Sequence, residues 1–286
     1  MQPTLDQSSQ SFPAPRSPVD CRSVSPLSAN WEVPPWRITV FEKKRSKYAV
    51  VIPVINESHR ITAQLERMKP FLSFVDVFIV DGGSTDGATE DSRLSASGIT
   101  AILRNAESRS SFCADLKIGF AHAMVEGYEG IILVDGNNKD NPSALPRFCE
   151  ALGSGLDFVQ GSRFLPGGKS ENTPVLRSFA IRQLHAPVLS FVARFRYTDT
   201  TNGFRAFSRK FLLDNRVQPF RNIFAGYDLP YYLAVRAGEM KFKVTEIPVE
   251  RAYPASGPIP TKITPIRGNL KMLGTLMRVC LHRLNP

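Results

Sequence analysis

The sequence predicts an α/β fold with a mostly parallel sheet that has helices on both faces. Short runs rich in Val and Ile alternate along the chain with longer mixed stretches. The runs are apolar throughout, which is typical of parallel strands buried on both faces. Polar residues cluster directly after four of these runs, at the carboxyl ends where open α/β sheets bind their ligands.

Five apolar runs are the expected strands, and two of the stretches between them are the expected helices. We expect strands at 48–54, 75–80, 100–103, 130–134 and 157–160, and helices at 58–69 and 112–126. Strands that alternate with helices form parallel crossovers, so their carboxyl ends meet at one edge of the sheet. Four polar strand ends at one edge describe a site.

The chain is expected to have three parts. Residues 1–36 read as a disordered Ser/Pro-rich tail, because Ser, Pro and Gln fill 15 of the first 30 positions and cannot bury enough apolar surface to offset the ordering entropy. Residues 37–253 form the α/β domain, and residues 254–286 form a basic amphipathic segment. The sequence leaves the oligomeric state open.

The positive charge of the chain lies in two blocks. The formal net charge is +10, from 36 basic and 26 acidic residues. Residues 251–286 hold six basic residues and residues 174–198 hold four, and neither block holds an acid. We expect two short helices around Pro187 in the earlier block and one in the later. These amphipathic helices either pack on the domain or lie on an anionic lipid surface.

In the C-terminal block, the expected apolar face comprises Leu270, Leu273, Met277, Cys280 and Leu284, opposite Lys271, Arg278 and His282. Nucleic acid is disfavoured as a partner, because basic motifs interleaved with aromatic residues are absent.

Composition also limits the cellular compartments in which we expect the protein. No segment has the roughly 20 apolar residues that a membrane-spanning helix needs, and the N-terminus lacks a basic-then-apolar signal peptide. The four cysteines are far apart, which excludes a zinc ribbon and disfavours a disulfide framework. We therefore expect a cytoplasmic protein that is not secreted. If the amphipathic helices lie on lipid, it rests peripherally on the inner face of the membrane.

Several common nucleotide and hydrolase motifs are missing. The first strand is not followed by G-x-G-x-x-G, and neither a G-x-x-x-x-G-K-[ST] phosphate loop nor a G-x-S-x-G elbow occurs. These absences disfavour a dehydrogenase, an NTPase and a serine hydrolase. A carboxylate-lined edge remains. Carboxylates attract phosphates when a divalent ion bridges the two.

Six motifs occur in a specific order between residues 48 and 253. They are Val50-Val-Ile-Pro-Val-Ile-Asn-Glu57, Val80-Asp-Gly-Gly-Ser-Thr-Asp86, Val134-Asp-Gly-Asn-Asn-Lys-Asp-Asn-Pro142, Gly161-Ser-Arg-Phe164 followed by Gly167-Gly168, Asp199-Thr-Thr-Asn-Gly-Phe-Arg205 and Val244-Thr-Glu-Ile-Pro-Val249. Together they resemble family 2 glycosyltransferases with the GT-A (Rossmann-like) fold, in particular the branch that transfers sugars to polyprenyl or dolichyl phosphate.

The resemblance implies an inverting transferase that uses a GDP- or UDP-sugar and a polyprenyl phosphate acceptor at the membrane surface. It implies Mg²⁺ or Mn²⁺ on Asp135 and Asn137. It also implies two sets of site residues. The nucleotide-sugar set is Pro53, Asn56, Glu57, Asp81, Ser84, Asp86, Asp135, Gly136 and Asn137. The catalytic set is Asp135, Arg163, Arg177 and Asp228, in which the two arginines bind a phosphate and Asp228 serves as base if the acceptor is a hydroxyl.

Three departures from the family pattern leave alternatives open. Asn137 replaces the second Asp of D-x-D, Lys139 replaces the usual Gln ligand, and Ser111-Phe112-Cys113 replaces Gly-Lys-Gly. Metal dependence is therefore an open question, and a hydroxyl acceptor or a degenerate nucleotide-sugar-binding module are alternatives. A nucleotidyltransferase ranks last, because Asn56-Glu-Ser-His59 is not a Gly-rich basic loop. Asp199 is expected to cap a turn, pair with Arg205 or act in catalysis, and His185 to be packed rather than a ligand.

Overall fold

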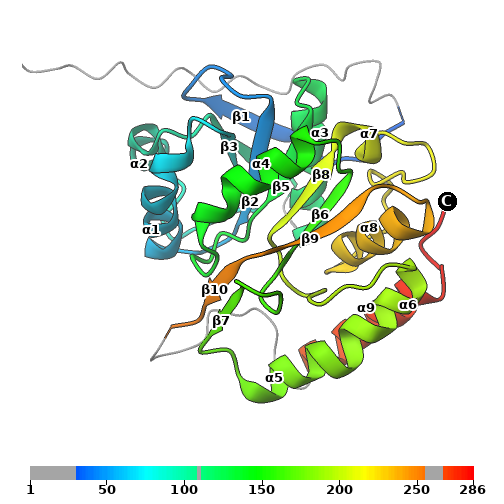
Figure 1. Cartoon of the computed structure of the whole chain (residues 1–286). Helices are drawn as coiled ribbons and strands as arrows, with labels where there is room; N and C mark the ends of the chain where they lie inside the picture. Colours follow the sequence, from blue (N-terminus) through cyan, green and yellow to red (C-terminus); the bar gives the residue numbers. More distant parts are fainter. Residues whose placement is uncertain (1–29, 108–110, 255–266) are drawn as a thin grey trace, which may run out of the picture.

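A computed structural model describes residues 30–107, 111–254 and 267–286. In that part of the chain the main sheet has eight strands, in the order β1-β4-β3-β2-β5-β8-β6-β9 (Figure 1). These strands are β1 (Trp36–Val40), β2 (Tyr48–Val54), β3 (Asp76–Asp81), β4 (Ala101–Asn105), β5 (Gly130–Leu133), β6 (Phe158–Ser162), β8 (Arg205–Ser208) and β9 (Val244–Pro248). A smaller parallel pair joins β7 (Lys169–Glu171) to β10 (Glu250–Ala252).

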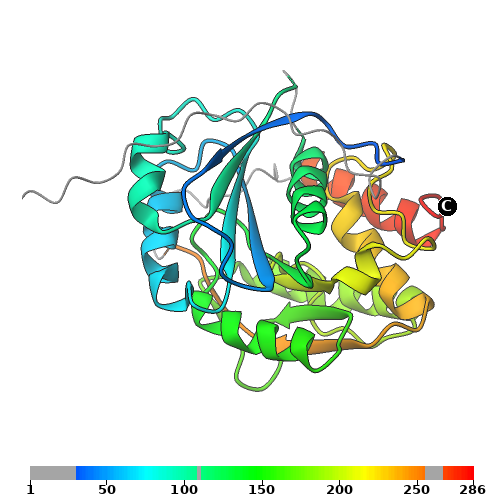
Figure 2. The ribbon, with the colours of Figure 1, turned by 90° about the horizontal axis from the view of Figure 1, so that it is seen from above.

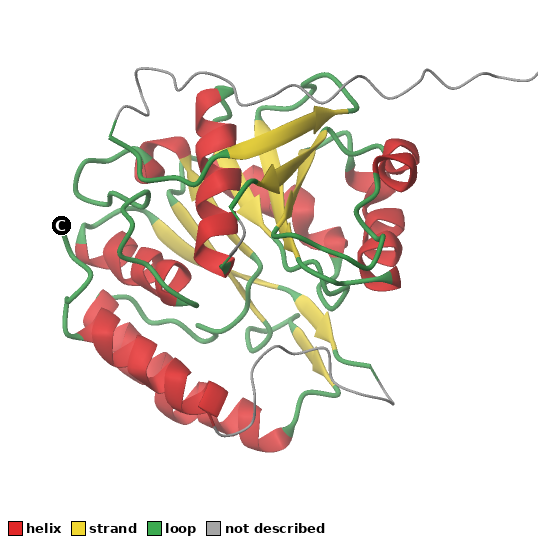
Figure 3. Ribbon diagram, turned by 180° about the vertical axis from the view of Figure 1, so that it is seen from behind, coloured by secondary structure: helices red, strands yellow, loops and turns green. Residues whose placement is uncertain are grey.

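Helices lie on both sides of the sheet (Figure 2, Figure 3). The described helices are α1 (His59–Met68), α2 (Asp91–Leu94), α3 (Phe112–Val125), α4 (Leu145–Gly153), α5 (Val175–Ala180), α6 (Ala186–Ala193), α7 (Arg209–Leu212), α8 (Asp228–Glu239) and α9 (Arg267–Cys280), with the π-helix η5 (Ile181–His185) and short 3₁₀ turns at Lys69–Phe71, Ser95–Ser97 and Pro142–Ala144. None of the helices in the described ranges is long and apolar enough to span a bilayer.

The strand directions place the site. The strands β2, β3, β4 and β5 are parallel, while β1 and β8 pair antiparallel with their neighbours. Because β5 and β6 are both antiparallel to β8, they run the same way, and β9 is parallel to β6. The carboxyl ends of β2, β3, β5, β6 and β9 therefore share one edge of the sheet. The predicted α/β class and all five predicted strands are confirmed.

Side chains that alternate along the strands build a separate core on each face. In β3, Phe78 and Val80 join the cluster under α3 and α8, whereas Val77 and Ile79 join the cluster under α1 and α4. Helix α3 approaches β2 closely, because a Cβ at Gly119 would lie 2.4 Å from Val51 Cγ1. Fully burying one such Val, Ile or Phe side chain contributes about 1.5–3 kcal/mol. The two cores hold the strand ends rigid beneath the site.

Residues 175–193 of the basic block form one continuous helical run, so the prediction of two short helices is wrong. Helix α5, the π-helix η5 and α6 follow one another without a break. The Ala186 N–H donates to the Ile181 carbonyl, five residues earlier. The wider π turn accommodates Pro187, which has no N–H to give to the helix.

Both ends of the described chain pack on the domain. Trp31 stacks on Phe220 with ring centroids 3.9 Å apart, so the expected tail is wrong at its inner end; residues 1–29 lie outside the described residues. In α9, Leu276 and Val279 are buried, while Leu273 and Met277 are exposed. The predicted apolar face of α9 is therefore split. Leu284 is buried, and the side chains of Leu270 and Lys271 lie outside the described residues.

Candidate active site

The loop after β3 is organised by Asp81. Its Oδ1 accepts hydrogen bonds from the N–H groups of Gly83 and Ser84 at 3.1 and 2.8 Å. Its Oδ2 accepts from the Thr89 hydroxyl at 2.9 Å. Asp81 is buried. In this structure the carboxylate caps its own loop. It thereby sets the shape of the surface that is expected to bind the nucleotide sugar.

The loops after β2 and β3 are bonded to each other. The Asn56 Oδ1 accepts from the Thr85 N–H at 2.8 Å, and the Asn56 N–H donates to the Ser84 hydroxyl at 3.1 Å. Asp86 Oδ2 accepts from the N–H and hydroxyl of Ser58 at 2.6 and 3.0 Å. These bonds lower the pKa of Asp86 despite the opposing effect of burial. Two of the predicted nucleotide-binding segments thus form one rigid unit.

The remaining predicted residues of this unit lie beside it. Glu57 is buried and forms an ion pair with Arg60 at 2.9 Å. Pro53 is partly buried on β2, opposite Val80 of β3. Gly136 is buried directly after β5 and packs on the end of β2. The structure brings the predicted nucleotide residues from β2, β3 and β5 to one edge.

The centre of the site is an ion-pair cluster of two carboxylates and one guanidinium. Arg251, from β10, donates through Nη2 to Asp135 Oδ2 at 2.7 Å and through Nη1 to Asp140 Oδ2. Backbone bonds fix this arrangement, since Asn141 N–H donates to Glu250 O at 3.0 Å and Ala252 N–H to Lys139 O at 2.9 Å. The predicted site residue Asp135 is therefore held by an arginine to which the sequence assigned no role.

Two further side chains complete this cluster. The Asn137 amide donates to Asp135 Oδ2 at 3.4 Å, and its carbonyl oxygen accepts from the Lys139 N–H at 3.3 Å. Lys139 is only 6 % exposed, and its ammonium lies 4.8 Å from the ring centroid of Tyr253. Asn137 therefore presents an N–H, and not an oxygen, to the carboxylate.

Burial and mutual charge set the protonation of the cluster. Burial raises the pKa of Asp140, whereas the nearby Arg251 and Lys139 outweigh burial at Asp135 and lower its pKa. Burial and the like charge of Arg251 lower the pKa of Lys139 to about 8. Two carboxylates, those of Asp135 and Asp140, thus face two cationic side chains, Arg251 and Lys139. The N–H groups of these two cations can also bind a further anion, such as a diphosphate.

A close backbone approach confines Asp135. A Cβ at Gly203 would lie 2.5 Å from Asp135 Oδ1. The glycine of the Asp199-Thr-Thr-Asn-Gly-Phe-Arg205 motif is thus required because its backbone passes directly over the carboxylate. The motif's role at this position is steric.

Arg163 is not a free phosphate ligand in this structure. It is 4 % exposed and donates through Nε and Nη2 to Asp199 at 2.6 and 2.9 Å, and through Nη2 to the Thr201 hydroxyl at 2.9 Å. The ion pair lowers the pKa of Asp199 although burial opposes ionisation. The pair fixes the loop after β6 to the loop before β8.

Of the three alternatives given for Asp199, the pairing with Arg205 is wrong. Arg205 donates to three backbone oxygens, those of Thr200, Asn202 and Pro230, at 2.7, 2.9 and 2.5 Å. Its side chain ties the loop to α8. The sequence pattern gives no way to choose between two nearby arginines as the partner of one buried carboxylate.

Arg177 is the predicted phosphate ligand with the most solvent access. It is partly buried on α5, and its guanidinium carbon lies 5.8 Å from the ring centroid of Tyr253. Its charge acts on Lys139, Tyr227 and Tyr231, which places it close to the cluster. The structure therefore brings Arg177 toward Asp135 from a different element.

Asp228, the candidate base, lies at the start of α8 and is fully buried. Its oxygens lie 2.7 and 2.6 Å from Arg278 Nη2, and Oδ2 accepts from the Ala225 N–H at 2.9 Å. In this structure the carboxylate anchors α9 to α8. His185 is packed as expected, with Nδ1 2.6 Å from the Thr200 hydroxyl and its ring 4.8 Å from that of Tyr231.

The side chains at Asp135 do not fit a divalent metal ion as they stand. Mg²⁺ and Mn²⁺ take oxygen ligands. Here Asp135 and Asp140 contact Arg251, and Asn137 turns its N–H toward Asp135. Among the described residues, no group of three or more His, Cys, Asp or Glu side chains is arranged to hold a metal.

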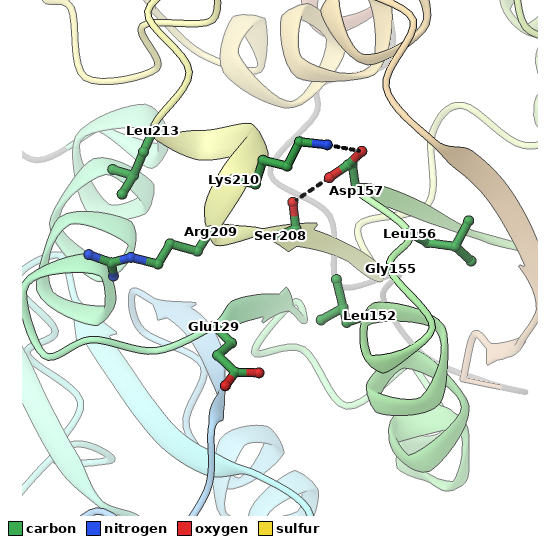
Figure 4. A pocket seen from close by; sticks show the side chains of 9 residues that line it. All are labelled: Glu129, Leu152, Gly155, Leu156, Asp157, Ser208, Arg209, Lys210 and Leu213. Atoms are coloured by element: carbon green, nitrogen blue, oxygen red, sulfur yellow. Dashed lines mark hydrogen bonds and ion pairs between the residues drawn. The ribbon is translucent and has the colours of Figure 1, made fainter.

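A hollow at the opposite edge of the sheet is unrelated to this cluster. It lies where β5 and β6 begin, and its charged side chains are used in structural contacts (Figure 4). Asp157 accepts from Ser208 at 2.9 Å and pairs with Lys210 at 3.6 Å, and Arg209 donates to the Met124 carbonyl at 2.6 Å. The carboxyl-end edge remains the candidate active site.

Sequence reasoning missed Arg251. It was counted only as part of the basic C-terminal block. A signal was present, because Glu250 and Arg251 directly follow the run 244–249, which resembles a late strand of the family. A residue just after a parallel strand reaches the carboxyl edge of the sheet.

The sequence is similar to those of known proteins. The sequence model described as "Glycosyl transferase family 2" matches residues 49–215. The chain is 27 % identical over 202 residues to a polyprenol monophosphomannose synthase of Mycolicibacterium smegmatis, covering 70 % of this chain and 75 % of that protein. It is 26 % identical over 201 residues to an undecaprenyl-phosphate mannosyltransferase of Micrococcus luteus, covering 70 % and 81 %.

Solved structures share the fold. A glucosyl-3-phosphoglycerate synthase from Mycobacterium tuberculosis superposes with a TM-score of 0.59 at 18 % identity, covering 82 % of this chain and 80 % of that one. The same enzyme in complex with Mn²⁺ and UDP-glucose gives a TM-score of 0.59 at 17 % identity, covering 82 % and 78 %. At this identity the likeness concerns the fold alone.

Proposed function

Because the chain belongs to glycosyl transferase family 2 and is a glycosyltransferase, we propose that it transfers a sugar from a GDP- or UDP-sugar to a polyprenyl phosphate, with inversion at the anomeric carbon. The observation that carries the proposal is the cluster of Asp135, Arg251 and Lys139 with Arg177 beside it, at the edge where β2, β3 and β5 end. The names of the two bacterial relatives support the acceptor class.

The reaction needs no base when the acceptor is a phosphate. An acceptor phosphate oxygen is already anionic and attacks the anomeric carbon directly. The bond from that carbon to the diphosphate breaks, and its electron pair stays on the leaving nucleoside diphosphate. The two anions meet at one place, so cationic side chains must offset both charges. We assign the acceptor phosphate to Arg177, and we assign Arg163 and Asp199 to holding the neighbouring loops in position.

The loops after β2 and β3 are assigned to the nucleotide. Asn56, Asp81, Ser84 and Asp86 form the interlocked unit, and Pro53 and Glu57 border it. Asp135, Gly136 and Asn137 follow β5 and adjoin the diphosphate. A hydroxyl acceptor finds less support, because the candidate base Asp228 is buried against Arg278.

A divalent ion enters this proposal only as the supply of positive charge at the diphosphate. The glucosyl-3-phosphoglycerate synthase structures hold Mn²⁺ with UDP or UDP-glucose. In this chain Asp135 and Asn137 do not fit the ion as they stand, so we route no step of the reaction through it.

The exterior of the α5–α6 run supports a position on a membrane. Its outward side chains include Val175, Leu176, Phe179 and Phe191, which are 63–87 % exposed. The exposed cations Arg182, Arg194 and Arg196 lie in the same block. Apolar side chains flanked by arginines are typical of helices that lie in an anionic lipid interface. We propose a peripheral position on the cytoplasmic face of the membrane.

The α5–α6 run joins the proposed lipid-facing surface to the candidate active site. The same helix that exposes Val175 and Leu176 carries Arg177, which faces Tyr253 and the Asp135 cluster. A polyprenyl phosphate whose chain stays in the bilayer would bring its headgroup to this helix. The proposed acceptor therefore reaches Arg177 without leaving the membrane surface.

A panel of nucleotide sugars tests the function. Thermal unfolding is measured with GDP- and UDP-sugars and with other nucleotides, each with and without Mg²⁺ or Mn²⁺. A ligand that binds only the folded chain raises the melting temperature by mass action. We expect a GDP- or UDP-sugar to raise it and to be consumed when polyprenyl phosphate is added. The absence of any shift across the panel would contradict the proposal.

A further inference from the structure

The charges around Asp135 balance without a divalent ion. Asp135 and Asp140 supply two carboxylates, and Arg251 and Lys139 supply two cations, and of these four side chains only that of Asp135 is more than a tenth exposed. Replacing the second Asp of D-x-D by Asn137 removes a third negative charge. A divalent ion added here would leave a confined site with an excess of two positive charges.

Backbone hydrogen bonds fix the two segments that carry the cationic side chains. Residues 139–141 and 250–252 pair like neighbouring strands through two backbone hydrogen bonds and an isolated bridge between Asp140 and Arg251. Arg251 is 6 % exposed and bonds both carboxylates, and Lys139 packs under Tyr253. The guanidinium is therefore a fixed part of the site and not a surface side chain that happens to reach it.

The side chains that remain are poor ligands for a metal. The Asn137 oxygen accepts from the Lys139 N–H, and Gly203 lies too close to Asp135 Oδ1 for even a Cβ to fit between them. A guanidinium offers five N–H donors in a planar fork that matches a phosphate. Arg251 can shift its hydrogen bonds from a carboxylate to a diphosphate oxygen, so no metal ion has to enter the site with the diphosphate.

We propose that Arg251, assisted by Lys139, replaces the divalent ion in this chain and neutralises the nucleoside diphosphate as it leaves. This rests on the proposed function. In the transfer step the acceptor oxygen bonds to the anomeric carbon, and the bond from that carbon to the diphosphate oxygen breaks. The electron pair stays on the diphosphate, where the Arg251 N–H groups receive the added charge. No proton moves and no metal ion takes part in the step.

The test is calorimetric binding of GDP and of UDP to the full chain, first in EDTA and then with Mn²⁺. We expect the preferred nucleotide to bind with dissociation constants that agree within about threefold in the two conditions. We expect Arg251→Gln to weaken binding in EDTA by about 30-fold or more, because a charge-assisted pair to phosphate is lost. Arg251→Lys should recover part of the loss. Arg216→Gln is the matched control, since Arg216 pairs with Asp214 on the surface.

The outcomes separate the two claims. The comparison of EDTA with Mn²⁺ uses the wild-type chain, so it does not depend on whether a variant folds. Binding that requires Mn²⁺ would overturn the inference and leave the proposed function intact. If EDTA leaves binding unchanged and a folded Arg251→Gln variant binds as tightly as the wild type, the proposed role of Arg251 is overturned. If neither nucleotide binds in either condition, the proposed function itself fails.

Discussion

Arg163 donates to Asp199 through two nitrogens, at 2.6 and 2.9 Å, inside the protein. The arginine assigned to phosphate binding is thus held by a carboxylate from the next motif along the chain. The pair links the loop after β6 to the loop before β8. The loop before β8 adjoins Asp135 through Gly203.

Removing one partner of this ion pair should lower the stability of the fold more than replacing both partners. We expect Asp199→Asn to lower the free energy of unfolding by about 3–5 kcal/mol, because it leaves Arg163 buried without its counter-charge. The double variant Arg163→Met with Asp199→Leu should regain more than half of that loss. Urea unfolding of Arg163→Met, of Asp199→Leu and of the double variant measures the coupling. Strictly additive effects would show that the pair is not a unit.

Stability should fall between pH 6.5 and pH 4 because of His185. Burial, with the charge of Arg205, lowers the pKa of His185 to about 4, against about 6.5 in the unfolded chain. The unfolded chain therefore takes up the proton first. This contribution is fully present above pH 6.5, and about 3 kcal/mol is lost as the pH falls to 4.

Unfolding free energies measured against pH check this assignment. The His185→Gln variant should lose less stability between pH 6.5 and 4 than the wild type. His59→Gln is the control, because His59 is exposed. If His185→Gln and the wild type have parallel profiles over this range, His185 is not the group responsible.

Asp228 should be structural. We expect Asp228→Asn to destabilise the chain by about 2 kcal/mol, since it weakens charge-assisted hydrogen bonds to Arg278. The rate of transfer to a polyprenyl phosphate should stay within about threefold of the wild-type rate, because an anionic acceptor needs no general base. Steady-state kinetics at a temperature where both proteins are folded measure this. A loss of about 100-fold or more in kcat would instead favour a hydroxyl acceptor with Asp228 as base.

Membrane binding should depend on the outward face of α5–α6. Changing Val175 and Phe191 together to Ser should weaken sedimentation with anionic vesicles by at least about tenfold, because apolar surface is withdrawn from the lipid. Phe74→Ser is the control, since Phe74 is also exposed but precedes β3. Point changes are preferable to deleting the C-terminal segment, which would also remove Arg278 from Asp228. Equal sedimentation of all three proteins would contradict a lipid-facing role.

The fold followed from the sequence because parallel strands leave a strong local pattern. The runs 48–54 and 75–80 are apolar at almost every position, so burial on both faces could be inferred from them alone. Strands β1 and β8 were missed. Arg205 to Ser208 begins with an arginine that is buried only because three backbone oxygens surround it. Long-range partners of this kind leave no local pattern.

The site was predicted in outline and not in its pairings. Strand ends placed Asp81 and Asp135 at one edge, since this depends only on strand direction. The partners of Asp135, Arg163 and Asp228 are Arg251, Asp199 and Arg278, which lie 36 to 116 residues away. Such pairs depend on how the loops after different strands meet. A single sequence does not encode that in any short motif.

One measurement tests the central claim most directly: transfer of labelled sugar from a GDP- or UDP-sugar to polyprenyl phosphate in anionic vesicles, with Asp135→Asn as the impaired variant. Asp214→Asn, at a surface ion pair away from the site, is the control. We predict a labelled lipid product with the wild type and the control. We predict at least about 100-fold less with Asp135→Asn, because Arg251 loses the carboxylate that positions its guanidinium beside the diphosphate. A wild-type chain that binds the nucleotide sugar but forms no lipid-linked sugar would contradict the proposed function.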